Sequence, residues 1–211
     1  MISFQKNNFR HLLFYLTVFT VACRTESTLD NSEVIYTEYS PPTLLTCVDS
    51  IIPHPSGCGM IPVPTDSSST IQIDMDRNGS FDFNISCSTW YQFVSASGPC
   101  ANYNSSMNIT GIISTCEIAS ESQFQVAKEF LFDEEINNAN SWVNYSTLQL
   151  NAAGAPFQTD FTGERYIGIR MGSDEGYRYG WILLSKNGFN LYVKSSGLQT
   201  CSGKFIRAGQ F

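Results

Sequence analysis

Residues 70–87, TIQIDMDRNGSFDFNISC, contain two strand patterns on either side of an acidic loop. Ile71 and Ile73 alternate with polar residues before the loop, and Phe81 and Phe83 begin a second alternation after it. A period of two is typical of a β-strand with one buried face. The stretch therefore predicts a sheet whose core face includes both phenylalanines.

The loop itself, DMDRNGSFD at residues 74–82, fits the spacing D-x-[DN]-x-[DN]-G-x-x-D. Calcium is a hard cation that binds six to eight oxygen atoms, and this spacing lets several of them converge from one tight loop. The expected metal ligands are Asp74, Asp76, Asn78, the carbonyl of Ser80, and Asp82. We expect the calcium ion to be structural. The alternative is a polar turn without metal, because Asp, Asn and Gly favour turns by themselves.

An EF-hand is excluded by two features of the same stretch. Its twelfth loop position is a bidentate Glu, whereas Ile85 stands there in this chain. The flanking patterns are also those of strands, while an EF-hand loop joins two helices.

The rest of the chain predicts an all-β fold with little helix. No amphipathic helical pattern of convincing length occurs, and many short apolar runs are punctuated by Gly, Asn, Ser and Pro, which favours an antiparallel β-sandwich, jelly-roll-like or a related two-sheet fold. The expected elements are a strand at Glu33–Tyr39 closed by Pro41 and Pro42, a long loop at 47–69, a strand at Met107–Ile118, a strand or short helix at Phe124–Phe132, and a hairpin from Tyr166–Met171 and Tyr179–Leu184.

The first 22 residues have the layout of a secretory signal peptide, with Lys6 and Arg10 before an apolar run. The run ends in Thr-Val-Ala-Cys at residues 20–23, which resembles the lipobox of bacterial lipoprotein precursors. The resemblance implies cleavage before Cys23 and lipidation of that cysteine, including a palmitate-type acyl chain. Ordinary signal cleavage and an uncleaved anchor are the alternatives. Residues 23–32 are then a polar tether, and 33–211 a single β-domain.

Six cysteines follow the lipidation candidate, and an even number in an exported chain predicts disulfide bonds. They are Cys47, Cys58, Cys87, Cys100, Cys116 and Cys201. Cys47 and Cys58 are the first candidate pair, because the segment between them is short and rich in Pro and Gly. Zinc is disfavoured, since no C-x-x-C pair occurs and His54 is the only histidine after the signal peptide.

Charge and motif content narrow the functional classes. The mature part carries ten basic and 19 acidic residues, a net charge of −9, which disfavours binding to nucleic acid. No nucleophile, nucleotide or metalloprotease motif occurs, so we expect no enzyme. The acids at 133–135 fit a solvated turn better than a glycosidase pair.

Aromatic residues keep a carbohydrate-binding module open as an alternative function. The chain has three Trp, ten Tyr and 15 Phe, and exposed rings on a β-domain can stack on sugars. Burial of these rings in the core is the competing explanation. Trp90, Trp142 and Trp181 are the residues that this alternative concerns most directly.

The segment YIGIRMGSDEGYRYGWILLS at 166–185 resembles a recurrent segment of uncharacterised exported bacterial proteins, some of them lipoproteins and others bearing PEP-CTERM signals. Those proteins also show an Asp-rich loop near the start, as 74–82 does here, and an apolar strand followed by Ala-Gly near the end. The resemblance implies export and a shared β-domain, with no catalytic residues. Gly168 and Gly180 are expected to allow close approach of neighbouring groups, and Arg170 to pair with Tyr179 or a carboxylate.

Taken together, these features predict a lipid-anchored protein of the bacterial cell envelope, most simply an outer-membrane lipoprotein. We expect a calcium-stabilised binding or structural module. Its partners would be the membrane, through the anchor, and a glycan or another protein.

Lipidation of Cys23 is testable by metabolic labelling with an alkyne fatty acid. We expect label on the wild-type chain and none on Cys23→Ser, because the thioether that carries the lipid cannot form without the thiol. Equal labelling of the two chains would refute the anchor.

Overall fold

The computed structural model describes residues 33–46, 50–53, 60–63, 68–93, 101–121, 125–151, 163–187 and 190–211. Its strands are β1 (Val34–Thr46), β2 (Ser50–Pro53), β3 (Met60–Val63), β4 (Ser68–Ile73), β5 (Phe83–Phe93), β6 (Ala101–Gly111), β7 (Cys116–Glu121), β8 (Val126–Ala127), β9 (Glu129–Phe130), β10 (Glu135–Ile136), β11 (Ser141–Val143), β12 (Tyr145–Asn151), β13 (Gly163–Ser173), β14 (Gly176–Asn187), β15 (Asn190–Gln199) and β16 (Ile206–Arg207). No α-helix occurs in these ranges.

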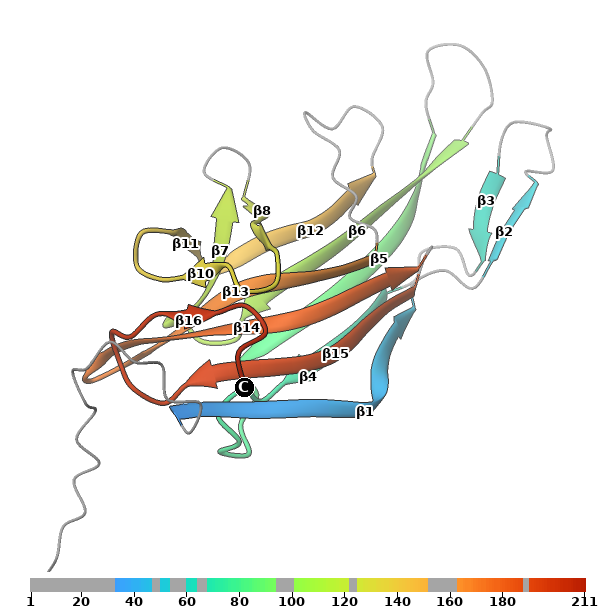
Figure 1. Ribbon diagram of the computed structural model, residues 1–211. Helices are drawn as coiled ribbons and strands as arrows, with labels where there is room; N and C mark the ends of the chain where they lie inside the picture. The colour runs from blue at the N-terminus through green and yellow to red at the C-terminus, as the bar shows by residue number, and fades with distance from the viewer. Residues whose placement is uncertain are drawn as a thin grey trace, which may run out of the picture.

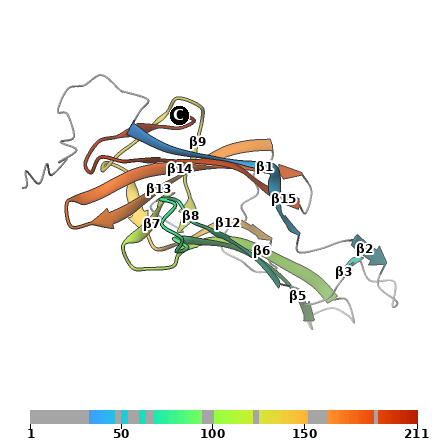
Figure 2. The same cartoon turned by 90° about the horizontal axis from the view of Figure 1, so that it is seen from below.

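Most of the strands belong to one 12-stranded sheet. Its order is β1-β15-β14-β13-β7-β8-β12-β6-β5-β4, with β11 attached to β7 and β9 to β13. The sheet is mixed, because β8 runs parallel to β12. It curls into two facing layers, one with β1, β15, β14 and β13 and the other with β12, β6 and β5 (Figures 1 and 2). The two ends of the order, β1 and β4, come close together, so the sheet is nearly closed into a barrel.

The predicted all-β class with little helix is confirmed. A sandwich of two separate sheets is not confirmed, because β13 is hydrogen-bonded to β7 from Ile169 to Met171 and so joins the two layers. The remaining strands form two small sheets, β10 with β16 and β2 with β3.

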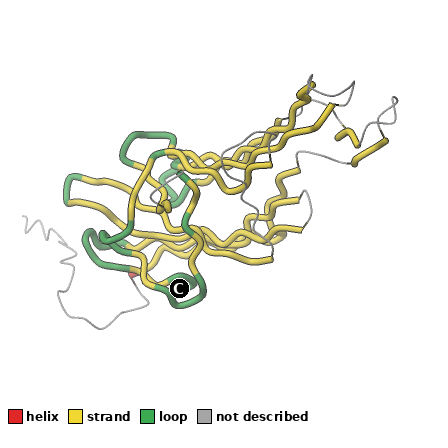
Figure 3. Tube along the Cα trace, turned by 90° about the horizontal axis from the view of Figure 1, so that it is seen from above, coloured by secondary structure: helices red, strands yellow, loops and turns green. Residues whose placement is uncertain are grey.

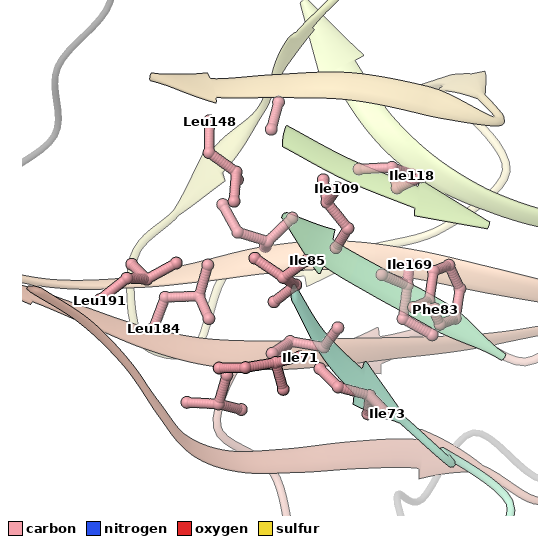
Figure 4. Packing of buried hydrophobic residues seen from close by; sticks show 14 of the residues in the cluster. Ile71, Ile73, Phe83, Ile85, Ile109, Ile118, Leu148, Ile169, Leu184 and Leu191 are labelled. Atoms are coloured by element: carbon pink, nitrogen blue, oxygen red, sulfur yellow. The ribbon is translucent and has the colours of Figure 1, made fainter. Parts of the chain in front are cut away.

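The main core fills the space between the two layers. It consists mostly of β-branched and other aliphatic side chains, which the close-up in Figure 4 shows pointing toward one another from both layers. Ile85 and Ile109 from one layer are 0% exposed, as is Ile169 from the other. Burial of each such side chain contributes about 1.5–3 kcal/mol. The alternation of apolar and polar residues in the sequence therefore corresponds to side chains that point in turn into this core and to the outside of the sheet.

A second, aromatic cluster lies on the outer face of β13 and β14. Trp181 and Tyr179 are buried there against Phe130 of β9 and Ile206 of β16. Figure 2 shows β9 and the end of the chain on the outer side of β14, and Figure 3 shows the described loops gathered at that end of the molecule. The C-terminal segment thus covers an apolar face that the curled sheet would otherwise expose.

The predicted hairpin is confirmed as β13 and β14, which pair from Gly163–Lys186 to Ser173–Gly176. Its glycines do allow close approach. A Cβ on Gly168 would lie 2.8 Å from the Phe130 ring, and one on Gly180 would lie 2.6 Å from the carbonyl oxygen of Gly197.

Two predictions about the first third of the chain are wrong in part. The first strand does not end at the prolines, because β1 continues to Thr46. A register shift between Glu38 and Thr43 takes the prolines out of the ladder. Among the described strands, β1 is hydrogen-bonded to β15 alone, so its other edge requires no N–H donor. The expected loop at 47–69 contains the paired strands β2 and β3.

The middle of the chain also differs in detail from the prediction. The expected strand at 107–118 is two strands, β6 and β7, with a turn at 112–115 between them. The ambiguous segment 124–132 contains β8 and β9 rather than a helix. Phe83 is fully buried as expected, but Phe81 is 51% exposed, because it belongs to the loop and not to β5.

The cysteines divide into two kinds. Cys87 and Cys201 each take part in a disulfide bond. Cys116 is a free, fully buried thiol, so its assignment to a disulfide is wrong. The other disulfide candidates, Cys47, Cys58 and Cys100, and the lipidation candidate Cys23 lie outside the described residues. Burial raises the pKa of the Cys116 thiol to about 11, which keeps it protonated and unreactive in the folded chain.

The free thiol changes the cysteine count of the lipidated chain. Apart from Cys116 and a lipidated Cys23, five cysteines remain, and an odd number cannot all pair with one another. If Cys23 carries lipid, the denatured monomer should therefore show at least two reactive thiols, and Cys116→Ser one fewer. Thiol titration in denaturant measures this number. A count of one in wild type would place Cys23 in a disulfide, and a count unchanged by Cys116→Ser would contradict the free thiol.

Candidate metal centre

The acidic loop between β4 and β5 is organised by its own side chains. Asp74 accepts hydrogen bonds from the backbone N–H groups of Asn78 (3.2 Å) and Gly79 (2.8 Å). Asp76 also accepts from the Asn78 N–H, at 3.2 Å. Gly79 has φ +87°, the left-handed conformation that glycine adopts without strain. The sequence favours this tight turn, which brings distant acids of the motif together.

Three carboxylates converge in this loop. One oxygen atom from each of Asp74, Asp76 and Asp82 lies within 4.8 Å of the other two. A carboxylate oxygen has two lone pairs, so accepting one N–H leaves it able to coordinate a cation. The arrangement can therefore hold a metal ion through hard oxygen donors.

Asp82 is the buried member of the cluster, with 5% of its surface exposed. Its Oδ2 accepts a hydrogen bond of 2.7 Å from the Met75 N–H. Burial, followed by the negative charges of Asp76 and Asp74, raises the pKa of Asp82 above its ordinary value, although the Met75 hydrogen bond acts in the opposite direction. A bound cation would remove the electrostatic cost of this buried charge.

The two other predicted ligands lie on the exposed side of the loop. Asn78 and Ser80 are both exposed, and the side-chain oxygen of Asn78 accepts the Ser80 N–H at 2.7 Å.

Two arginines connect the loop to distant strands, and the metal-ligand motif does not predict these contacts. Arg178 of β14 forms a salt bridge of 3.2 Å with Asp76. Arg77 donates to the Thr37 hydroxyl at 3.1 Å and to the carbonyl of Tyr36, both on β1. The first pair is 102 residues apart in sequence, so only the tertiary fold brings it together.

Arg170 lies in a different cluster, where its guanidinium contacts other side chains of the protein. Its guanidinium forms a salt bridge of 2.7 Å with Glu117 and lies over the rings of Tyr177 (3.8 Å) and Trp142 (4.8 Å). The expectation of a carboxylate partner is therefore met, and Tyr179 lies opposite Arg170 in the ladder.

The acids at 133–135 are exposed; Asp133 lies in a turn, as the sequence suggests, whereas Glu135 begins β10. Glu134 accepts the Leu131 N–H, and Asp133 lies 3.5 Å from Arg207. His54 lies outside the described residues. No helix in the described parts of the chain has the length and apolar character needed to cross a membrane.

Comparison with known proteins identifies no family for this chain. No family model matches the chain, and neither the curated proteins nor the solved structures contain a match to it. The metal cluster must therefore be judged on its own chemistry.

The raised pKa of Asp82 predicts how the metal-free protein responds to pH. A carboxyl group with a raised folded pKa binds more protons in the folded than in the unfolded chain, so its ionisation destabilises the fold as the pH rises above the ordinary value of 3.8. Asp82→Asn removes this charge and keeps an oxygen for the Met75 N–H. In chelator at pH 7, we expect Asp82→Asn to unfold at the same or a higher temperature than wild type.

This difference in melting temperature should shrink as the pH falls from 7 towards 4, because wild-type Asp82 then becomes protonated. Asp174→Asn in the exposed β13–β14 turn is the matched control and should leave the pH profile unchanged. A lower melting temperature for Asp82→Asn at pH 7 would contradict the buried-charge explanation.

Proposed function

We propose that this chain is a lipid-anchored cell-envelope protein whose β-domain is a binding or structural module stabilised by one calcium ion. The convergence of the Asp74, Asp76 and Asp82 carboxylates in one loop is the observation that carries the proposal. The signal-like residues 1–22 and the cysteine at position 23 support the lipid anchor.

Calcium is favoured over magnesium and zinc by the donors. Every member of the cluster offers oxygen, and neighbouring Asn78 and Ser80 offer further amide and carbonyl oxygens. Calcium accepts such irregular sets of six to eight oxygens, whereas magnesium requires a small octahedral shell and zinc prefers nitrogen and sulfur. An ion of charge +2 also balances the cluster better than Arg178 alone, since three carboxylates face one salt-bridged guanidinium.

The role of the ion is structural in this proposal. Asp82 and Asp76 are held in the fold through Met75 and Arg178, and the loop leads directly into β5. No enzyme activity is proposed, and the binding partner is a glycan or a protein of the envelope.

Calcium should raise the stability of the domain. At a free concentration 100 times the dissociation constant, linkage gives about 2.7 kcal/mol. For a domain of this size that is a rise of about 5–10 °C in melting temperature. The measurement is thermal melting in chelator and in calcium at about 5 mM. Since extracellular sites have dissociation constants of roughly 0.1–1 mM, this is about 5–50 times the dissociation constant, and the expected shift at this concentration is about 2–9 °C. Magnesium at the same concentration should give a much smaller shift.

Asp76→Ala should abolish the calcium shift, because it removes a ligand and a negative charge together. Asp174→Ala, an exposed acid outside the loop, is the matched control and should retain the full shift. A wild-type melting curve that calcium leaves unchanged would reduce residues 74–82 to a polar turn.

A further inference from the structure

A shallow pocket opens where the turn after β9 meets the residues that follow β16. Its volume is about 280 Å³, and it is lined by Phe132, Asp133, Arg207, Ala208, Gly209, Gln210 and Phe211. Ligand pockets usually measure about 300–1,000 Å³, so this one suits a single small unit rather than an extended ligand.

Main-chain hydrogen bonds hold the two walls of the pocket together. The Asp133 N–H donates to the carbonyl of Ala208 at 2.9 Å, and the Ala208 N–H donates to the carbonyl of Glu134 at 2.9 Å. Beside them, β10 and β16 pair through Glu135–Arg207 and Ile136–Ile206. The pocket is therefore preformed, which lowers the entropy lost when a ligand binds.

Phe132 supplies an exposed aromatic platform. Its ring is 69% exposed, yet it rests against Gly209, where a Cβ would come within 2.6 Å of the ring. The Tyr166 ring lies 6.5 Å away, centroid to centroid. A ring that is supported from one side and open to solvent can stack against the apolar face of a ligand. Phe211, 68% exposed, adds a second ring to the lining.

The polar groups of the pocket offer both donors and acceptors. The side chains of Asp133 and Arg207 are 66% and 38% exposed, and their charged groups are 3.5 Å apart. The side-chain oxygen of Gln210 accepts the Arg207 N–H at 3.1 Å, whereas its Nε2 is buried and has no hydrogen-bond partner. A ligand that fits must have an apolar face for Phe132 and an edge that both donates and accepts hydrogen bonds.

We propose that this pocket binds a neutral hexopyranose unit of an envelope or environmental polysaccharide. A pyranose ring has an apolar C–H face for Phe132 and hydroxyl groups that can donate to Asp133 and accept from Arg207. An anionic sugar fits less well, because the chain has a net charge of −7 and Asp133 faces the ligand. The inference rests on the binding-module part of the proposed function and does not depend on the metal ion.

The test is affinity electrophoresis of the full chain in native gels that contain a neutral glucan, mannan or galactan. At least one of these polysaccharides should retard the wild-type chain. Phe132→Ala should weaken the binding at least tenfold, and Asp133→Asn should weaken it measurably. Phe81→Ala removes another half-exposed ring, remote in sequence from the pocket, and should bind like wild type. Thermal melting of each variant checks that it is folded.

Absence of retardation in all three gels overturns the proposal, and so does equal retardation of wild type and Phe132→Ala. The proposal is also overturned if the wild-type chain binds a protein or phospholipid vesicles but no sugar, and Phe132→Ala loses that binding. Repeating the gels in calcium and in chelator separates this inference from the metal site. A calcium-dependent melting shift without retardation refutes only the sugar pocket, and retardation without that shift refutes only the metal.

Discussion

The buried carboxylate of Asp82 is the constraint on which the arrangement of the loop and its neighbours depends. Its backbone N–H donates to the carbonyl of Ile73 at 2.8 Å, and its carbonyl accepts the Ile112 N–H at 2.8 Å. Its side chain holds the Met75 N–H. One residue thus joins the end of β4, the acidic loop and the turn after β6. A negative charge at such a position is costly unless it is hydrogen-bonded and offset by a nearby positive charge.

The same loop lies at the open seam of the curled sheet. A sheet that nearly closes leaves β1 and β4 as edge strands, whose unpaired backbone groups are prone to wrong pairing. Arg77 attaches the loop to β1, and Arg178 attaches it to β14 two strands further along. The ordered loop therefore links both layers, so its electrostatic balance affects the closure of the whole sheet and not only the local turn.

The sequence reveals the parts of this structure that are governed by local periodicity. The alternation at 71–87 and in the β13–β14 hairpin, and the turn residues of the acidic loop, correctly indicate strands and a carboxylate cluster. It does not reveal the single curled sheet, because pairing of β13 with β7 depends on contacts some 50 residues apart. The sequence wrongly predicts a buried Phe81, because the same alternation of apolar and polar residues extends two residues into the loop. Arg178 carries no local signal at all.

Cys116 supplies a last argument about which cation suits the loop. Its thiol is close enough to the cluster that Asp82 and Asp76 help to raise its pKa, after the larger effect of burial. A deprotonated thiolate would be a soft ligand that attracts zinc. Because the Cys116 sulfur is not among the converging ligand atoms, the donors that lie within reach of one another are the oxygens of three carboxylates. The hard-oxygen character of this cluster is the physical basis for expecting calcium rather than zinc there.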